Sequence, residues 1–82
     1  MKKAPYTPKK GLNLVGAAVR RIRRNSRPRV TLLDLSARLE VLGVRLSESM
    51  LSKIEGGERG VADYEVIALA HALKVPIEEL YA

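Results

Sequence analysis

The sequence predicts an all-α fold of five short helices that pack into one domain. Phe and Trp are absent and only three tyrosines are present, so the core must be built from Leu, Ile, Val, Ala and Met, which suits packed helices. Apolar residues recur at spacings of three and four, and no segment shows the sustained alternation that a half-buried strand needs. A chain of 82 residues has room for one hydrophobic core.

The N-terminal segment predicts a flexible basic arm followed by a first helix. Residues 1–12 (MKKAPYTPKKGL) contain two prolines, four lysines and a glycine. The folded domain is expected over residues 13–82, with Asn13 as a candidate cap for a helix that runs to about Arg24. Its inward face consists of apolar residues: Val15, Ala18, Val19 and Ile22. Pro28 breaks the helix, because the residue before a proline avoids helical geometry.

The next two helices carry start and stop signals of their own. Thr31 and Asp34 are spaced as a capping box and predict the start of a second helix. Gly43 ends it, because glycine accepts the left-handed conformation found after helices. Its apolar stripe is Leu35, Leu39 and Leu42. Ser47 is expected to cap a third helix over about residues 47–55, which two glycines terminate. The inward residues of this helix are Met50, Leu51 and Ile54.

A fourth helix is expected from about Ala62 to Lys74. Asp63 and Glu65 suit the positive end of its dipole. Its inward residues are Val66, Ile67, Ala70 and Leu73. Pro76 lies where a short fifth helix can begin. The packing residues of that last helix are Ile77, Leu80 and Tyr81.

Positive charge is concentrated in the first part of the chain. Residues 1–29 contain ten Lys or Arg and no acid, whereas residues 30–82 contain five basic and nine acidic residues. The two parts carry formal charges of +10 and −4, which account for the net charge of +6. A cationic half of this strength attracts a polyanion through phosphate contacts and counterion release. The alternative is a solvated basic surface, and charge alone does not separate the two.

A set of residues in the later helices resembles a known family. The pattern S-x-x-x-L-S-x-I-E-x-G begins at Ser47, after the leucines of the second helix, and IALAHALKVPIEEL begins at Ile67. At these spacings, the segment Thr31–Leu80 resembles the Cro/repressor-like helix-turn-helix family, also called the xenobiotic-response-element family. The resemblance implies a five-helix fold of the lambda-repressor type, with residues 47–55 as a recognition helix in the major groove of double-stranded DNA.

The third helix has the two faces that such a role requires. A helix in the major groove needs an apolar face that holds it on the domain and a polar face that meets base edges. Leu51 and Ile54 supply the apolar face. The opposite face gives the candidate base-reading residues, Glu48, Ser49, Ser52 and Lys53. Lys53 can donate to guanine O6 and N7, and Glu48 can accept from cytosine N4. The alternative is an ordinary amphipathic surface helix.

The resemblance also implies phosphate contacts and a structural ion pair. Phosphate-binding candidates come from the first helix, the loop after it and the loop after the third helix: Arg20, Arg24, Arg27, Arg29 and Arg59. In the family, the acid that matches Glu55 pairs with an arginine of the first helix, and counting back along the chain indicates Arg23. Breaking such a pair costs about 3–5 kcal/mol if it is buried.

Three residues or segments depart from the family pattern. Leu32 stands where the family usually has a phosphate-binding glutamine, so that contact is lost or is made by Arg27 or Arg29. The turn LEVLGVRLS between the second and third helices is longer than the family's tight turn, which can change the angle at which the helices cross. Glu48 places an acid toward DNA, which either makes the site sequence-selective or argues against DNA binding.

We therefore expect a transcriptional regulator of the repressor type that binds double-stranded DNA on the nucleoid in the cytoplasm, as a homodimer. Leu80 and Tyr81 are candidates for the dimer seam or for plain packing. The main alternative is a protein-interaction module that keeps the fold. It would use Leu32 and Leu33 as an exposed apolar patch for a partner such as a toxin or a polymerase subunit. A third alternative is a sequence-blind nucleic-acid binder driven by residues 1–29.

Catalytic, metal and cofactor sites are not expected. Without cysteine, neither a disulfide framework nor a thiolate metal site can form. His71 is the single histidine and has no clustered acids beside it, so it makes no metal site. The serines of the third helix are explained by capping and surface roles. No stretch is long enough to span a membrane, and no segment remains for a domain that senses a small molecule.

Overall fold

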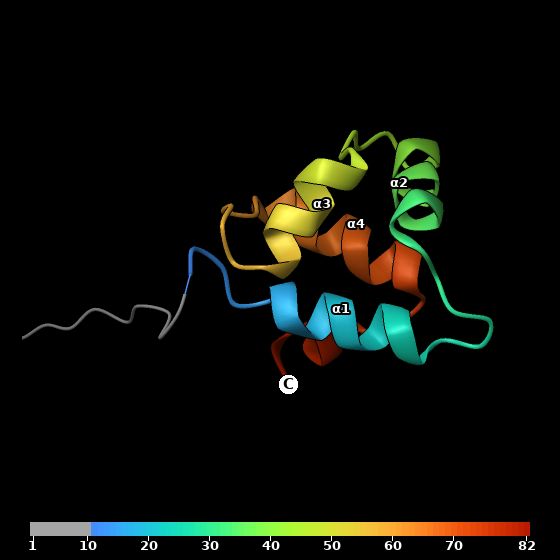
Figure 1. The fold of residues 1–82 in the computed structure, drawn as a ribbon, viewed down its shortest axis with the longest axis horizontal. Coiled ribbons are helices and arrows are strands. Elements are labelled where there is room, and N and C mark those ends of the chain that lie inside the picture. The colour runs from blue at the N-terminus through green and yellow to red at the C-terminus, as the bar shows by residue number, and fades with distance from the viewer. Residues whose placement is uncertain (1–10) are drawn as a thin grey trace, which may run out of the picture.

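The computed structural model describes residues 11–82, which form four α-helices, a terminal 3-10 helix and no strand (Figure 1). The elements are α1 (Gly16–Asn25), α2 (Leu32–Val41), α3 (Glu48–Glu55), α4 (Asp63–Leu73) and η1 (Ile77–Tyr81). The all-α prediction is confirmed. The expected fifth helix is a 3-10 helix, so the number of α-helices in this range is four. The expected basic arm, residues 1–12, lies outside the described residues except for its last two.

The helices enclose one core, to which every element contributes. α3 packs against α1 and α2, while α4 packs against α1 and α2 from behind in the view of Figure 1. η1 packs against α1 and α4. The largest fully buried side chains are Val15, Val19, Leu35, Leu39, Leu46, Leu51, Ile54, Leu69 and Leu80. Within residues 11–82, no helix combines the length and the apolar character needed to cross a bilayer.

Asn13 connects the start of α1 to the end of α3. It does not occupy the N-cap position, which belongs to Val15, and α1 therefore begins later than expected. Its Oδ1 nevertheless accepts hydrogen bonds from the amides of Val15 (3.0 Å) and Gly16 (2.7 Å). Its Nδ2 donates to the carbonyls of Ile54 (3.0 Å) and Arg59 (2.8 Å). One amide side chain thus satisfies backbone groups of two elements.

Two glycines allow close backbone contact between this N-terminal segment and α3. A Cβ on Gly16 would overlap the carbonyl oxygen of Ile54, so only glycine lets α1 approach this near. Farther upstream, a Cβ on Gly11 would lie 2.6 Å from the carbonyl oxygen of Gly57, and the amide of Leu12 donates to that oxygen at 2.8 Å. The chain from Gly11 onward therefore runs along the C-terminal end of α3.

The turn between α2 and α3 is held against the core at both ends. Gly43 adopts φ +85°, which glycine tolerates without strain, and the amide of Val44 then donates to the carbonyl of Leu39 at 2.9 Å. Farther along, the Ser36 hydroxyl donates to the carbonyl of Leu46 at 2.7 Å. Leu46 itself is fully buried. The turn is consequently part of the packed structure.

Four residues expected to pack inward are exposed: Leu42, Ile67, Ile77 and Tyr81. Leu42 follows the last residue of α2 and so leaves the helical stripe, and Leu46 fills the core beyond the turn instead. The buried face of α4 is centred on Leu69, which turns Ile67 toward solvent. In η1, only Leu80 is buried.

Candidate nucleic-acid interface

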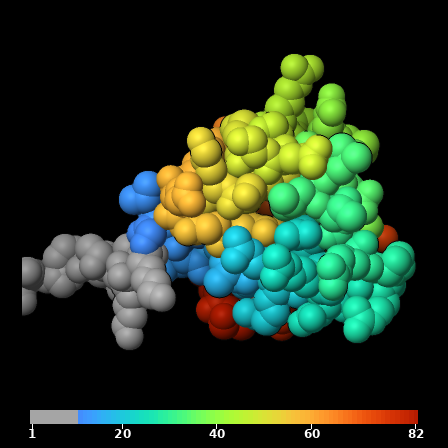
Figure 2. All heavy atoms as spheres, viewed as in Figure 1, coloured from blue at the N-terminus to red at the C-terminus, as the bar shows by residue number. Residues whose placement is uncertain are grey.

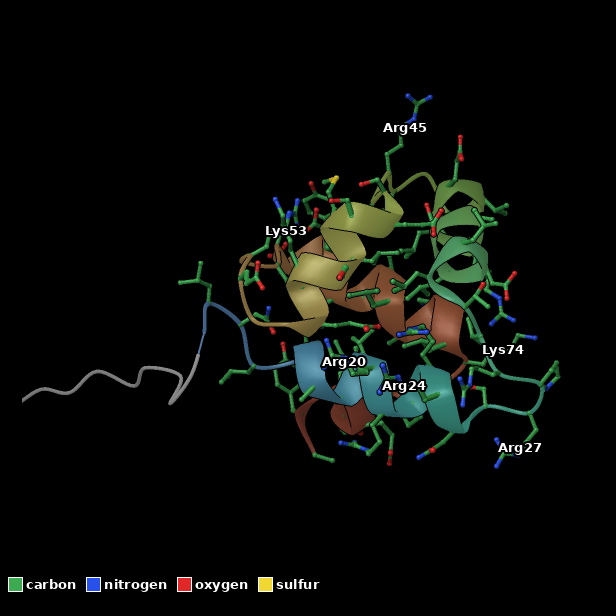
Figure 3. The ribbon with its side chains drawn as sticks, in the orientation of Figure 1. Arg20, Arg24, Arg27, Arg45, Lys53 and Lys74 are labelled. Carbon is green, nitrogen blue, oxygen red and sulfur yellow. The ribbon has the colours of Figure 1, made fainter. Side chains whose placement is uncertain are left out.

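α3 is anchored by one face and exposes the other. Leu51 and Ile54 are fully buried, and the Ser47 hydroxyl caps the helix by accepting from the amide of Met50 at 3.1 Å. The four candidate base-reading residues are all exposed: Glu48, Ser49, Ser52 and Lys53. Within residues 11–82, none of their side chains is held by an ion pair or hydrogen bond, and Lys53 extends from the domain (Figure 3). Their polar groups are available to a ligand.

A buried ion pair ties this helix to α1. Nε of Arg23 donates to Oε2 of Glu55 at 2.7 Å, and a terminal nitrogen of Arg23 donates to Oε1 at 2.9 Å. The remaining terminal nitrogen donates to the carbonyl of Val30 at 3.1 Å. The hydrogen bonds to Glu55 raise the pKa of Arg23 above its ordinary value. The expected partners therefore form a bidentate, fully hydrogen-bonded contact, which is the geometry that best offsets the cost of burying charge.

Arg20 also contacts Glu55, which the sequence reasoning did not anticipate. Its Nε lies 3.3 Å from Oε1 of Glu55, and its side chain remains 43% exposed. Two guanidinium groups thus share one carboxylate, and the cluster keeps an excess positive charge at the surface beside α3. Arg20, expected to contact phosphate, is at once a partner in this network and a surface cation.

The other expected phosphate-binding residues differ in whether they form ion pairs inside the domain. Arg24, Arg27 and Arg29 are exposed, and none of them forms an ion pair within residues 11–82. Arg59 is engaged internally, because it lies 3.3 Å from Oε1 of Glu65. Glu65 also accepts from the amide of Ala62 at 2.9 Å, so this pair helps to fix the start of α4.

The exposed surfaces of α3 and α1 lie side by side on one face of the molecule (Figure 2). Arg20 and Arg24 project from α1 on this face (Figure 3). The structure therefore brings together the candidate base-reading helix and part of the arginine set. Arg27 projects outward from the loop after α1, away from α3 (Figure 3).

Two residues of this region were missed at the level of sequence. The sequence indicates Asn13 only as a helix cap, whereas in the structure its side chain also bonds the end of α3. The sequence pattern predicts no role for Arg45, yet this residue projects from the turn directly before α3 (Figure 3). The signal for Arg45 is present in the sequence, because a basic residue stands between two apolar ones, Val44 and Leu46, in the turn before α3.

The expected apolar patch of Leu32 and Leu33 does not form as a pair. Leu32 is partly buried and packs against the core, because it shares a helical face with Leu35 and Leu39. Leu33 is 63% exposed, and the other strongly exposed apolar residue of α2 is Val41, at 86%.

The described residues contain no group of His, Cys, Asp and Glu side chains that could hold a metal ion. No protein-family model matches the chain, and no curated protein or solved structure does so either.

Proposed function

We propose that this chain is a sequence-specific double-stranded DNA-binding protein and a transcriptional regulator of the repressor type, with a repressor-like helix-turn-helix formed by α2 and α3. The observation that carries the proposal is the construction of α3. Its apolar face and Glu55 hold it on the domain, while four exposed polar side chains face solvent beside arginines of α1. A single helix of this kind fits the major groove, which is about 12 Å wide.

The polar groups divide into two roles. Glu48, Ser49, Ser52 and Lys53 read base edges, because short acceptors and donors on a groove-facing helix can distinguish base pairs. The exposed arginines hold phosphates and set the register, chiefly Arg24, Arg27 and Arg29, with a smaller share from Arg20 and Arg59, which also have internal partners. The protein would act on the nucleoid in the cytoplasm.

We further propose a homodimer on a palindromic site, with half-sites about 34 Å apart. Leu80 cannot form the seam because it is fully buried, whereas Tyr81 is 54% exposed and can. Sedimentation tests this point: a monomer at every concentration, bound one to one on a palindrome, would contradict it.

Selection of bound sequences from a random DNA pool tests the proposed function. The wild-type chain should enrich a consensus, and its affinity for the enriched duplex should exceed that for a scrambled duplex of equal length and composition. Equal affinities would indicate a sequence-blind binder. Absence of binding to both duplexes would contradict DNA binding altogether.

One observation favours the interaction-module alternative. Leu33 and Val41 are strongly exposed on α2, and Ala37, also exposed, lies between them at four-residue spacing. Residues four apart share a helical face, so the three form an apolar stripe that a protein partner could cover. If this stripe is the functional surface, the DNA selection should enrich nothing, and replacing Leu33 and Val41 by serine should leave the stability of the fold unchanged.

A further inference from the structure

Arg45 is held outward by its neighbours in the turn between α2 and α3. On one side, Val44 packs against the core and its amide donates to the carbonyl of Leu39 at 2.9 Å. On the other side, Leu46 is 2% exposed and its carbonyl accepts from the Ser36 hydroxyl at 2.7 Å. With both neighbours directed inward, the side chain of Arg45 extends away from the body of the domain (Figure 3).

Within residues 11–82, Arg45 forms no ion pair. Glu40 lines the same shallow hollow as Arg45, together with Ser36, Leu46 and Ser47, but no ion pair or hydrogen bond joins Arg45 to Glu40. An exposed, unpaired arginine adds little to the stability of the fold. The backbone around Arg45 is already fixed by the hydrogen bonds of its two neighbours, so an anion outside the molecule would have to order only the side chain.

Arg45 and the arginines of α1 lie on opposite sides of α3. In the view of Figure 3, α3 lies between Arg45 on one side and Arg20 and Arg24 of α1 on the other. A major groove is bounded by two phosphate backbones, one on each side of an inserted helix. Arg20 and Arg24 lie on the side of α3 that would face one of these two backbones.

We propose that Arg45 binds a phosphate on the wall of the major groove opposite the wall contacted by the arginines of α1. α3 would then be held between cationic contacts on both strands, which fixes its depth and tilt in the groove. The inference rests on the proposed function, since it requires α3 to lie in a major groove. Arg45 contacts the backbone rather than a base because it belongs to the turn and stands two residues before the helix cap, Ser47.

Charge-removal variants of the full chain provide the first test. Arg45→Ala should weaken binding to the enriched and scrambled duplexes by similar factors and reduce the salt slope by about one unit. Arg45→Lys should restore most of the affinity, because a phosphate accepts a point charge whereas a bidentate base contact does not. Circular dichroism should show wild-type folding, since the Arg45 side chain is exposed and forms no ion pair within residues 11–82.

Arg21→Ala is the matched control. Arg20 and Arg23 both point toward Glu55 of α3. At about 100° per residue, Arg21 lies about 130° around α1 from the direction midway between these two, whereas Arg24 lies about 70° from it. Arg21 is exposed, so its loss removes the same charge from a position on α1 that is farther from α3 than Arg24 is. If Arg45→Ala reduced the salt slope no more than Arg21→Ala, the inference would be overturned.

Neutral methylphosphonates placed one at a time along each strand locate the contact. The wild-type chain should lose affinity at phosphates on both walls of the groove. Arg45→Ala should become insensitive on one wall and Arg24→Ala on the other. Insensitivity to the same phosphates in both variants would overturn the inference, as would a loss confined to the enriched duplex that lysine does not restore. If the wild type binds neither duplex, the proposed function itself is wrong.

Discussion

Glu55 is the residue on which the contact between α1 and α3 depends most. Its carboxylate is 2% exposed and accepts from two arginines, of which Arg23 is also buried and makes the shorter, bidentate contact. A buried carboxylate left without its main partner retains the cost of its lost hydration. The two arginines should therefore differ strongly in their effect on stability, although both touch the same group.

Arg23→Ala should lower the free energy of unfolding by about 3 kcal/mol or more, because Glu55 loses its bidentate partner in a buried position. Arg20→Ala should cost about 1 kcal/mol or less, since Arg20 remains 43% exposed and its pairing is screened by solvent. Urea denaturation followed by circular dichroism measures both. Equal losses would show that the two arginines share the carboxylate equally in solution.

Alanine variants of Lys53 and Arg24 distinguish base reading from non-specific electrostatic attraction. Each variant loses one positive charge, so a sequence-blind binder should respond to both in the same way. If α3 lies in the major groove, Lys53→Ala should cost about 1–3 kcal/mol on the enriched duplex and little on scrambled DNA. Arg24→Ala should weaken both duplexes alike and lower the salt slope by about one unit. Glu48→Ala should raise affinity for scrambled DNA and reduce discrimination. Equal shifts on both duplexes for all three variants would exclude a base-reading role for α3.

At the scale of single elements, local chemistry explains where the helices begin. The Thr31 hydroxyl accepts from the amide of Asp34 at 3.0 Å, and the Asp34 carboxylate accepts from the amide of Thr31 at 3.1 Å, which together form the expected capping box of α2. Ser47 caps α3 as expected. Both motifs involve residues three apart, so they form without help from the rest of the molecule.

The capping box of α2 should make stability depend on pH. Hydrogen bonds from the backbone and then the side chain of Thr31 lower the pKa of Asp34. A carboxyl whose folded pKa is depressed contributes stability that is fully present above its unfolded pKa, about 3.9, and is lost as the pH falls through the folded value. Titration by NMR should show the depressed pKa, and Asp34→Asn should flatten this part of the stability profile. A pKa at the ordinary value would show that the box is not maintained in solution.

At the scale of the whole molecule, α1 belongs to the same cooperative unit as the other helices. It contributes the fully buried Val19, its N-cap residue Val15 is also fully buried, and its Arg23 neutralises Glu55. Deleting residues 1–24 would therefore open the core and leave a buried carboxylate unpaired. The remainder should give no cooperative transition in thermal or urea denaturation. A sharp transition in that fragment would show that α1 is dispensable.

Deleting only residues 1–10 is the complementary experiment. It removes Lys2, Lys3, Lys9 and Lys10 but leaves the contacts that begin at Leu12 and Asn13. Stability should be unchanged, whereas the salt dependence of DNA binding should flatten because fewer counterions are released. The enriched consensus should stay the same, since lysines that contact phosphates carry no sequence information. A changed consensus would show that the arm reads bases.

The helical class, the starts of α2 and α3 and the pairing of Arg23 with Glu55 were all accessible from the sequence. The class and the helix starts follow from local spacing, while the ion pair came from family resemblance. The exposed polar face of α3 was likewise predictable, because the periodicity of Leu51 and Ile54 defines the opposite side. The use of that face to bind DNA stays a prediction.

Only the tertiary structure decided which apolar residues are covered and which charges are occupied. Ile67 and Leu69 are equally apolar, yet one is 51% exposed and the other fully buried, because burial depends on where α1, α2 and η1 lie against α4. Arg59 is paired with Glu65 while Arg45 points outward. Local propensity sets the conformation of a segment, whereas contacts between segments distant in sequence set the environment of each side chain.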